Sequence, residues 1–446
     1  MLVNFSVKNW MCFKNLTELS MVASRIRKPD HFVNKVPKYH FRVLPTAVIY
    51  GANASGKSAL IKALYFAREF IMGEQSYRGS ALNIKGRKAF LLDFISNNQP
   101  TEFSFTLLLG DTAPLVYQYD FAIDDTKVVY EKLSLISNNA NVNNKVIFHR
   151  YNNKIEYDMF DDSFYSYAKK GTKSNQLFLN NVVSQLSDEE TAKDYQTVYN
   201  WFAEKLVIIF PNTKYNDMER LFFETDRFSK EISRILSVLD TGIYNLTSEE
   251  IQLAQAEIPN RLIERVKSDI SIDKSIRISD YNGNHFIFTQ TANGNIQVKK
   301  FVSTHRNIDG EEVNFDFCEE SDGTKRLLDL LPLLINLTQH EMDITCVVDE
   351  LDRSLHTLIS KEIVKAFLFG RDKDNKSQLI LSTHDINLMD KKLFRLDEVW
   401  MCEKDYEGCS ELISMYDYKN ITKLPELKEL YLKGKVGGIP IISDWF

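Results

Sequence analysis

Hydrophobic and polar residues alternate along the first 50 positions in the manner of β-strands. The alternation runs through 2–7 and 16–22 and ends in the continuous apolar run 47–50. A glycine-rich turn follows this run. Beyond the turn, apolar residues recur at helical spacing over 58–70, and no proline interrupts them. The pattern therefore predicts a buried strand, a glycine turn and a buried helix in direct succession.

The pattern changes several times further along the chain. Residues 90–157 predict an antiparallel sheet whose strands are separated by Gly, Pro, Asn and Asp. Residues 187–268 look helical, with capped helix starts at 187–190 and 247–250, interruptions at Pro211, Gly242 and Pro259, and no coiled-coil heptads. From 276 to 317, short strands return with the Asn-Gly and Asp-Gly turns of hairpins. We therefore expect an N-terminal half over 1–186, a helical insertion over 187–275 and a C-terminal half over 276–446.

Composition narrows the class of protein. The 446 residues are 44% hydrophobic and 26% charged, as in folded globular proteins. The net charge of −6 gives no global attraction to nucleic acid, and we interpret the short basic clusters at 25–28, 169–173 and 391–395 as solvated surface. The five cysteines lack the spacing of a zinc site and are expected to be buried, reduced thiols. Without a signal-peptide pattern, and with its longest apolar run only near 330–337, the chain is expected to be soluble and cytoplasmic, without membrane contact.

The glycine turn carries the strongest chemical signal. Its residues, GANASGKS at 51–58, match the G-x-x-x-x-G-K-[ST] phosphate-binding loop between a strand and a helix. Backbone amides would wrap the phosphates of ATP, Lys57 would reach the β and γ phosphates, and Ser58 would ligate Mg²⁺. The alternative is a chance glycine turn, against which the flanking strand and helix argue. The predicted ATP-binding residues of this loop are Gly51, Asn53, Ala54, Ser55, Gly56, Lys57, Ser58 and Ala59.

Two later apolar runs end in polar residues that suit the same chemistry. The run 344–348 ends in Asp349, which can hold Mg²⁺, and Glu350, which can orient or deprotonate the attacking water. Taken alone, this pair is as well explained by a polar turn at the end of a strand. The run 379–381 leads to His384 within Ser-Thr-His-Asp. An isolated histidine in that position is more often an ordinary core or surface residue.

A third segment, Glu-Ser-Asp-Gly-Thr-Lys-Arg at 320–326, heads a predicted helix that runs to 337. A hydroxyl residue and a glycine at a helix N-terminus can present backbone amides and the helix dipole to a phosphate. The plain alternative for the same residues is an ordinary N-cap.

In their order along the chain, the loop 51–58, the segment 320–326, the pair 349–350 with the residues after it, and the segment 382–385 resemble elements of the ABC-type ATPases. The resemblance implies that Ser321, Gly323 and Thr324 form a variant signature sequence, Asp352 belongs to the D-loop, and His384 is a switch histidine that acts with the catalytic Lys57 and Glu350. A Q-loop glutamine is not evident, and Gln99 and the segment 89–94 are its candidates. The implied fold is α/β, an ABC/SMC-like P-loop ATPase head with an antiparallel β lobe and an inserted helical subdomain. The implied activity is hydrolysis of ATP with Mg²⁺ in a head-to-tail homodimer or higher homo-oligomer.

Within that class, the chain resembles the bacterial AAA15/OLD-like ATPases through residues 4–9 and 13–15, 321–332 and 430–440. The 62 residues after His384 are too few for the TOPRIM nuclease of OLD proteins. The resemblance extends to the ATPases of PARIS-, Septu- and RloA-type antiphage systems. It implies a regulatory ATPase that responds to a phage protein and controls a separate nuclease or toxin effector, with TOPRIM and HNH types as candidates. A RecF-like repair ATPase that clamps DNA, and a scaffold that hydrolyses ATP slowly or not at all, share the same residues, so nucleic-acid binding stays open.

Overall fold

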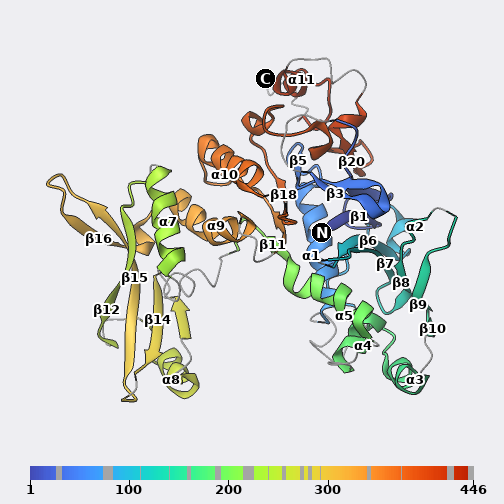
Figure 1. The fold of residues 1–446 in the computed structure, drawn as a ribbon, viewed down its shortest axis with the longest axis horizontal. Helices are drawn as coiled ribbons and strands as arrows, with labels where there is room; N and C mark the ends of the chain where they lie inside the picture. The colour runs from blue at the N-terminus through green and yellow to red at the C-terminus, as the bar shows by residue number, and fades with distance from the viewer. Residues whose placement is uncertain are drawn as a thin grey trace. The chain divides into compact units, whose positions relative to one another are not determined.

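The computed structural model describes residues 1–26, 33–73, 84–110, 112–139, 141–157, 162–185, 192–213, 226–239, 241–253, 258–271, 276–279, 284–291, 293–338, 343–372, 374–418 and 426–439. The chain divides into two compact units (Figure 1). Unit 1 comprises Met1–Asn212, Asn336–Asp352 and Ser360–Phe446, and unit 2 comprises Thr213–Ile335 and Arg353–Ile359. Among the described residues, no helix has the length and apolar character needed to cross a membrane.

The first sheet of unit 1 has seven strands, all paired antiparallel, in the order β10-β9-β8-β7-β6-β1-β2. These strands are β1 (Leu2–Lys8), β2 (Thr17–Ser20), β6 (Thr101–Leu109), β7 (Leu115–Ile123), β8 (Val128–Leu135), β9 (Lys145–Tyr151) and β10 (Lys154–Tyr157). Unit 1 also contains helices α2 (Phe94–Asn97), α3 (Asp162–Gly171), α4 (Phe178–Gln185) and α5 (Lys193–Asn200). The antiparallel sheet predicted over 90–157 is thus confirmed.

The second sheet of unit 1 has the order β11-β17-β18-β5-β19-β20 and is parallel except for its last pair. Its strands are β5 (Thr46–Tyr50), β11 (Leu206–Ile209), β17 (Thr345–Val348), β18 (Gln378–Ser382), β19 (Val399–Lys404) and β20 (Ser410–Ser414). Three of them, β5, β17 and β18, are buried along their whole length, as their unbroken apolar runs predicted. Because parallel strands end at one edge of a sheet, the residues that follow these three strands come together.

Helix α1 (Lys57–Ile71) follows β5 and joins the core shared by both sheets. Its Phe66 ring lies 4.9 Å from the Trp10 ring and 5.8 Å from the Phe103 ring of β6. The two sheets are also cross-linked by polar contacts. The buried Gln378 side chain of β18 accepts from the Leu2 amide at 2.6 Å and donates to the Leu2 carbonyl at 2.9 Å. The start of α1 is therefore held on a rigid base.

Smaller elements complete unit 1. Strands β3 (Asn34–Val36) and β4 (Phe41–Val43) form a separate two-stranded sheet, and helices α10 (Thr357–Gly370), which begins in unit 2, and α11 (Leu427–Leu432) lie in the C-terminal part of the chain.

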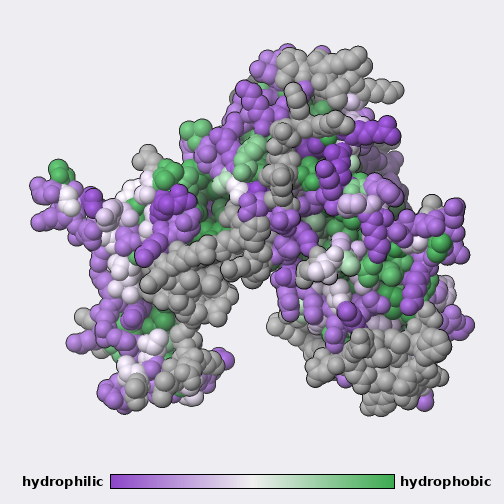
Figure 2. Space-filling view, in the orientation of Figure 1, coloured by the Kyte–Doolittle hydropathy of each residue, from purple (hydrophilic) through white to green (hydrophobic). Residues whose placement is uncertain are grey.

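Unit 2 is a five-stranded antiparallel sheet with helices. The order is β12-β15-β14-β13, and β16 also pairs with β15. The elements are α7 (Asp226–Val238), β12 (Asn245–Ile251), α8 (Asn260–Asp269), β13 (Ile276–Ser279), β14 (His285–Gln290), β15 (Ile296–Arg306), β16 (Glu312–Asp316) and α9 (Asp322–Thr338), which ends in unit 1. Ile308, in the turn between β15 and β16, is fully exposed, and Figure 2 shows an apolar spot at the tip of this hairpin.

The structure corrects the prediction that residues 187–268 are helical. The segment 247–250, predicted as a helix start, lies within β12, where Glu249 and Glu250 stand opposite Lys300 and Lys299 of β15. Opposite charges across a strand pair favour this pairing over a local helix cap. The region 187–275 therefore contains β11 and β12 beside its helices, and its boundaries remain a prediction. The predicted helix start at 187–190 and the turn at 282–283 lie outside the described residues.

The cysteines depart in part from the expectation that all are buried. All five are free, and Cys346, Cys402 and Cys409 are buried, but Cys12 and Cys318 are partly exposed.

Candidate functional site

The loop 51–58 follows β5 and wraps tightly at its two glycines. A Cβ on Gly51 would lie 2.4 Å from the Cys402 carbonyl oxygen. Gly56 has a φ of +126°, and a Cβ there would lie 2.9 Å from Ser410 Oγ. Gly56 is also the N-cap of α1, so the loop runs directly into the positive end of a helix. These two positions require glycine because neighbouring atoms fill the space of any side chain.

Two polar side chains of the loop lack strong partners. Ser55 is 3% exposed, and no hydrogen-bond partner for its Oγ is found among the described residues. Lys57 is 5% exposed, and among the described residues its amine donates to loop carbonyls alone, Gly51 O at 2.8 Å and Ala52 O at 3.0 Å. Burial lowers the pKa of Lys57. A buried hydroxyl and a buried ammonium would both be better satisfied by an anion in the loop.

Asp349 lies at the centre of a second cluster. It follows β17, is 2% exposed, and its Oδ1 accepts from Ser58 Oγ at 3.1 Å and from Ser382 Oγ at 2.6 Å. Ser58 comes from α1 and Ser382 from the end of β18. A carboxylate and a hydroxyl at this separation are ligands that Mg²⁺ prefers. The structure thus brings together the two residues predicted to bind metal.

Glu350 and His384 stand beside this cluster and line one pocket with Lys57. Glu350 has a φ of +53°, and its amide donates to Ser382 Oγ at 2.9 Å. The His384 amide lies 3.3 Å from both carboxylate oxygens of Asp352. Burial, followed by the charge of Lys57, lowers the pKa of His384, although the nearby carboxylates oppose this. A neutral imidazole at pH 7 follows.

The pocket has a volume of about 1010 Å³, and the charged residues of its lining are mainly basic. Its charged side chains include Lys57, Lys62, Lys88 and Lys404, which outnumber the acidic residues Asp125 and Glu350. The predicted loop residues Asn53, Ala54, Ser55, Gly56, Ser58 and Ala59 also line it. Such a pocket is large enough for a nucleotide and has the charge that a polyphosphate requires.

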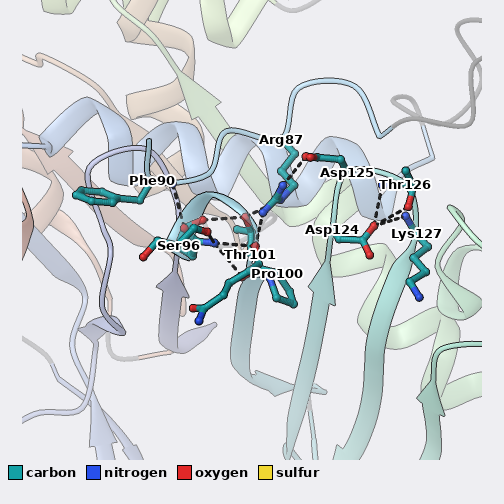
Figure 3. Close-up of polar contacts among 11 residues, drawn as sticks. Arg87, Phe90, Ser96, Pro100, Thr101, Asp124, Asp125, Thr126 and Lys127 are labelled. Atoms are coloured by element: carbon teal, nitrogen blue, oxygen red, sulfur yellow. Dashed lines mark hydrogen bonds and ion pairs between the residues drawn. The ribbon is translucent and has the colours of Figure 1, made fainter. Parts of the chain in front are cut away.

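One wall of the pocket is the segment 87–92 between α1 and α2, held by the contacts that Figure 3 shows. The Arg87 guanidinium pairs with Asp125 and donates to Thr101 Oγ1 at 3.0 Å. The Asn9 side chain accepts from the Phe90 amide at 3.0 Å and donates to the Ser96 carbonyl at 2.7 Å. The wall is therefore fixed in place. The Q-loop candidates from the sequence are this region, 89–94, and Gln99. The Gln99 carbonyl, and not its side chain, accepts from Asn9 and Arg87.

The residues predicted as the signature belong to unit 2, whereas Lys57 belongs to unit 1. Ser321 Oγ accepts from the Thr324 amide at 3.1 Å and lies 2.8 Å from Thr324 Oγ1, as an N-cap of α9 does. A Cβ on Gly323 would lie 2.6 Å from the Ser354 carbonyl oxygen, so glycine is needed there. The signature role of Ser321, Gly323 and Thr324 stays a prediction.

Sequence reasoning missed one central residue, Ser382. Its Oγ connects Asp349 to the Glu350 backbone, although more than 30 residues separate it from both in the sequence. The signal was present, because Ser382 directly precedes Thr383 and His384 at the end of an apolar run. Only the pairing of β17 with β18 shows which atoms it holds.

Comparison with known proteins places the chain in a family. A family model described as "AAA domain, putative AbiEii toxin, Type IV TA system" matches residues 47–390, which is most of the chain. The match begins within β5 and includes the loop 51–58, Asp349, Glu350 and His384. No curated protein was found to match the sequence.

Proposed function

The chain belongs to this family of AAA domains and is a P-loop ATPase by family, and from that premise we propose that it hydrolyses ATP with Mg²⁺. One observation carries the proposal. Ser58, Asp349 and Ser382 form a chain of hydrogen bonds, and Glu350 lies beside it in the pocket of Lys57. A metal-binding pair, a carboxylate base and a phosphate-binding lysine thus converge from three separate parts of the sequence.

The residues of the site would gain hydrogen-bond and charge partners from ATP. ATP supplies the phosphoanhydride bond and brings Mg²⁺ with it. Ser55 Oγ, which has no partner among the described residues, gains a phosphate oxygen, and Lys57 exchanges the Gly51 and Ala52 carbonyls for the β and γ phosphates. Ser58 and Asp349 hold the metal.

Glu350 is the proposed general base. Glu350 lines the pocket, and the bond from its amide to Ser382 fixes the backbone that carries it. It accepts a proton from the attacking water. His384, neutral at pH 7, can accept or donate a hydrogen bond at the γ-phosphate, and Asp352 holds its backbone.

Two substitutions test hydrolysis. Glu350→Gln keeps the size of the side chain but removes the base, so turnover should fall by about 100-fold or more while ATP affinity changes little. Lys57→Ala should lose ATP affinity itself. ATP titration by fluorescence and phosphate release measure the two effects separately. Unchanged turnover in Glu350→Gln refutes the base assignment, and a normal titration of Lys57→Ala refutes phosphate binding by the loop.

We further propose that the site is completed by a second copy of the chain. The supporting feature is the N-terminus of α9, where Ser321, Gly323 and Thr324 can offer amides and a helix dipole to a γ-phosphate. Mixing a Ser321→Arg chain with a Lys57→Ala chain should restore about one working site per dimer, although each variant alone is inactive. If mixtures at all ratios stay inactive while each variant dimerises, the site does not form across two chains.

The proposed biological role is regulation of a separate toxin or nuclease in antiphage defence. Support comes from the family description, which names a toxin of a toxin–antitoxin system. The test is to express the gene next to that of this chain, alone and together with the wild-type or Glu350→Gln protein. Growth arrest by the neighbour alone, relieved by the wild-type chain, supports the role. No toxicity in any combination, during phage infection included, refutes it.

A further inference from the structure

A second, smaller groove in unit 1 is lined by basic side chains. It has a volume of about 690 Å³ and lies along the β3–β4 hairpin and the segment 22–25. Arg25, Lys35, His40 and Arg42 line it, and none of its lining residues is acidic. The exposed Lys38 stands beside it, 5.5 Å from the centre of the Tyr39 ring. The groove thus concentrates positive charge in a chain whose net charge is −6.

The basic side chains of the groove have no acidic partner in the described part of the chain. None of the five pairs with a carboxylate among the described residues, and Arg42 donates only to the Ser24 carbonyl. Asp397 is the nearby acid, since it accepts from the Ser24 amide at 2.7 Å. It is 5% exposed and already paired with Arg395, at 2.7 and 2.9 Å. Within the described part of the chain, therefore, no carboxylate neutralises the positive charge of the groove.

The hairpin places two of these charges in direct opposition. Lys35 and Arg42 are register partners in the β3–β4 pair. Like charges directly across a strand pair are destabilising, so this pairing has an energetic cost in the isolated chain. An anion bound between the two side chains would convert that repulsion into attraction.

The groove also has a rigid backbone. Val36 and Val43 are buried in the core of unit 1, and the Ala23 amide donates to the Arg42 carbonyl at 2.8 Å. The Tyr39 hydroxyl accepts from the Val116 amide of β7 at 3.2 Å. The charges are therefore presented at fixed positions, which reduces the entropy lost when a partner binds.

We propose that this groove binds the phosphate backbone of duplex DNA. A polyanion suits the groove, because its described lining offers several cations and no acidic counterpart. Duplex DNA carries about one charge per 1.7 Å of axis, about twice the charge density of a single strand. The contact reads no sequence, since the groove presents cations to phosphates and not to base edges. This inference goes beyond ATP hydrolysis and does not depend on it. For Arg25, the proposal replaces the interpretation of the cluster 25–28 as solvated surface. Arg27 and Lys28 of that cluster lie outside the described residues.

The experiment measures binding of a fluorescent 25-base-pair duplex by the full chain between 50 and 200 mM salt. Four phosphate contacts, from Arg25, Lys35, Lys38 and Arg42, predict a log–log slope of about −3.6 and a loss of affinity of about 150-fold over this range. In Lys35→Gln/Arg42→Gln, two contacts remain, so the slope should fall to about −1.8 and the loss to about 12-fold. At 50 mM salt, this variant should bind at least about tenfold more weakly than the wild type.

A matched control removes two positive charges elsewhere. Lys154 and Lys433 have 79% and 61% exposed side chains in unit 1, and Lys154→Gln/Lys433→Gln should bind the duplex within about twofold of wild type. Folding is checked by thermal unfolding. The Lys35→Gln/Arg42→Gln variant should melt close to the wild-type temperature, because removal of the like-charge pair offsets loss of the hydrogen bond from Arg42 to the Ser24 carbonyl.

Three outcomes overturn the proposal. The duplex does not bind at 50 mM salt, or the groove variant binds as the control does, or vesicles containing 30% phosphatidylserine bind through the groove while the duplex does not. Because ATP titration is measured on the same variants, failure of this proposal is separate from failure of the ATPase assignment.

Discussion

Replacing Ser382 with alanine removes one hydroxyl that holds two groups of the site at once. Its Oγ donates to Asp349 Oδ1 at 2.6 Å and accepts from the Glu350 amide at 2.9 Å. A hydrogen bond to a charged group contributes about 1.5–3 kcal/mol, and a buried amide without a partner costs about 1–3 kcal/mol. Ser382 is fully buried, and its bond to Asp349 is buried as well, so water does not replace that bond. We therefore expect Ser382→Ala to lower the free energy of unfolding by about 3 kcal/mol.

The same change should reduce turnover more than affinity. Ser58 still holds Asp349 at 3.1 Å, so metal and ATP binding persist in weakened form. Glu350 loses the bond that fixes its backbone, and its φ of +53° is a conformation that a non-glycine residue keeps only when held. Misplacement of a catalytic group by about 1 Å lowers the rate by about 100-fold. We expect kcat to fall by a factor of about 10–100.

Ser360→Ala is the matched control. Ser360 is also fully buried, in α10, but no hydrogen-bond partner for its Oγ is found among the described residues. Urea unfolding and phosphate release of both variants should therefore separate the loss of a buried hydroxyl from the loss of its bonds. If Ser382→Ala matches Ser360→Ala in both measurements, Ser382 does not organise the site.

Three further predictions concern the loop, the sheet contact and pH. Gly56→Ala should abolish ATP binding and lower the melting temperature, because the added Cβ would lie 2.9 Å from Ser410 Oγ. The control is Gly294→Ala, which also has a positive φ but has open space around it, and which should cost only the backbone strain of about 1 kcal/mol. Gln378→Leu should lower the free energy of unfolding by about 2–4 kcal/mol in urea, since the Leu2 amide and carbonyl lose a buried partner. The pKa of His384 lies below its ordinary value of 6.5, so its contribution to stability is complete above pH 6.5 and is lost as the pH falls through the folded pKa. The difference in unfolding free energy between wild type and His384→Asn should therefore shrink from pH 7.5 to pH 5. A constant difference contradicts the lowered pKa.

The parts of the site that the sequence predicted are those encoded by contiguous residues. The loop 51–58 needs its glycines, lysine and serine at fixed offsets, and the strand before it and the helix after it are periodic enough to recognise. Asp349 and Glu350 were found because an apolar strand ends directly before them. In both places, local chemistry and local structure agree.

The parts that the sequence could not predict depend on distant partners. The strand at β12 is decided by its pairing with β15, some 50 residues away, and the Thr-Ser-Glu-Glu segment in it equally suits a helix start. The wall of the pocket depends on Asn9, whose side chain reaches a segment about 80 to 90 residues later. The sequence did not predict the basic groove, because a net charge describes the whole chain. Lys35 and Arg42 become direct neighbours only when β3 pairs with β4.

The two interpretations of the segment 320–326, as an N-cap and as a signature sequence, are compatible in the structure. Ser321 caps α9 by accepting from the Thr324 amide, which is the plain reading of the sequence. An N-cap satisfies only part of the first turn of a helix, and the amides of Asp322 and Gly323 have no hydrogen-bond partner among the described residues. Gly323 also brings the Ser354 carbonyl against the start of α9, so the segment is fixed in shape. The γ-phosphate of ATP bound to a second chain would require a capped, rigid helix start with two open amides. The capping role of Ser321 therefore supports the proposed composite site and does not compete with it.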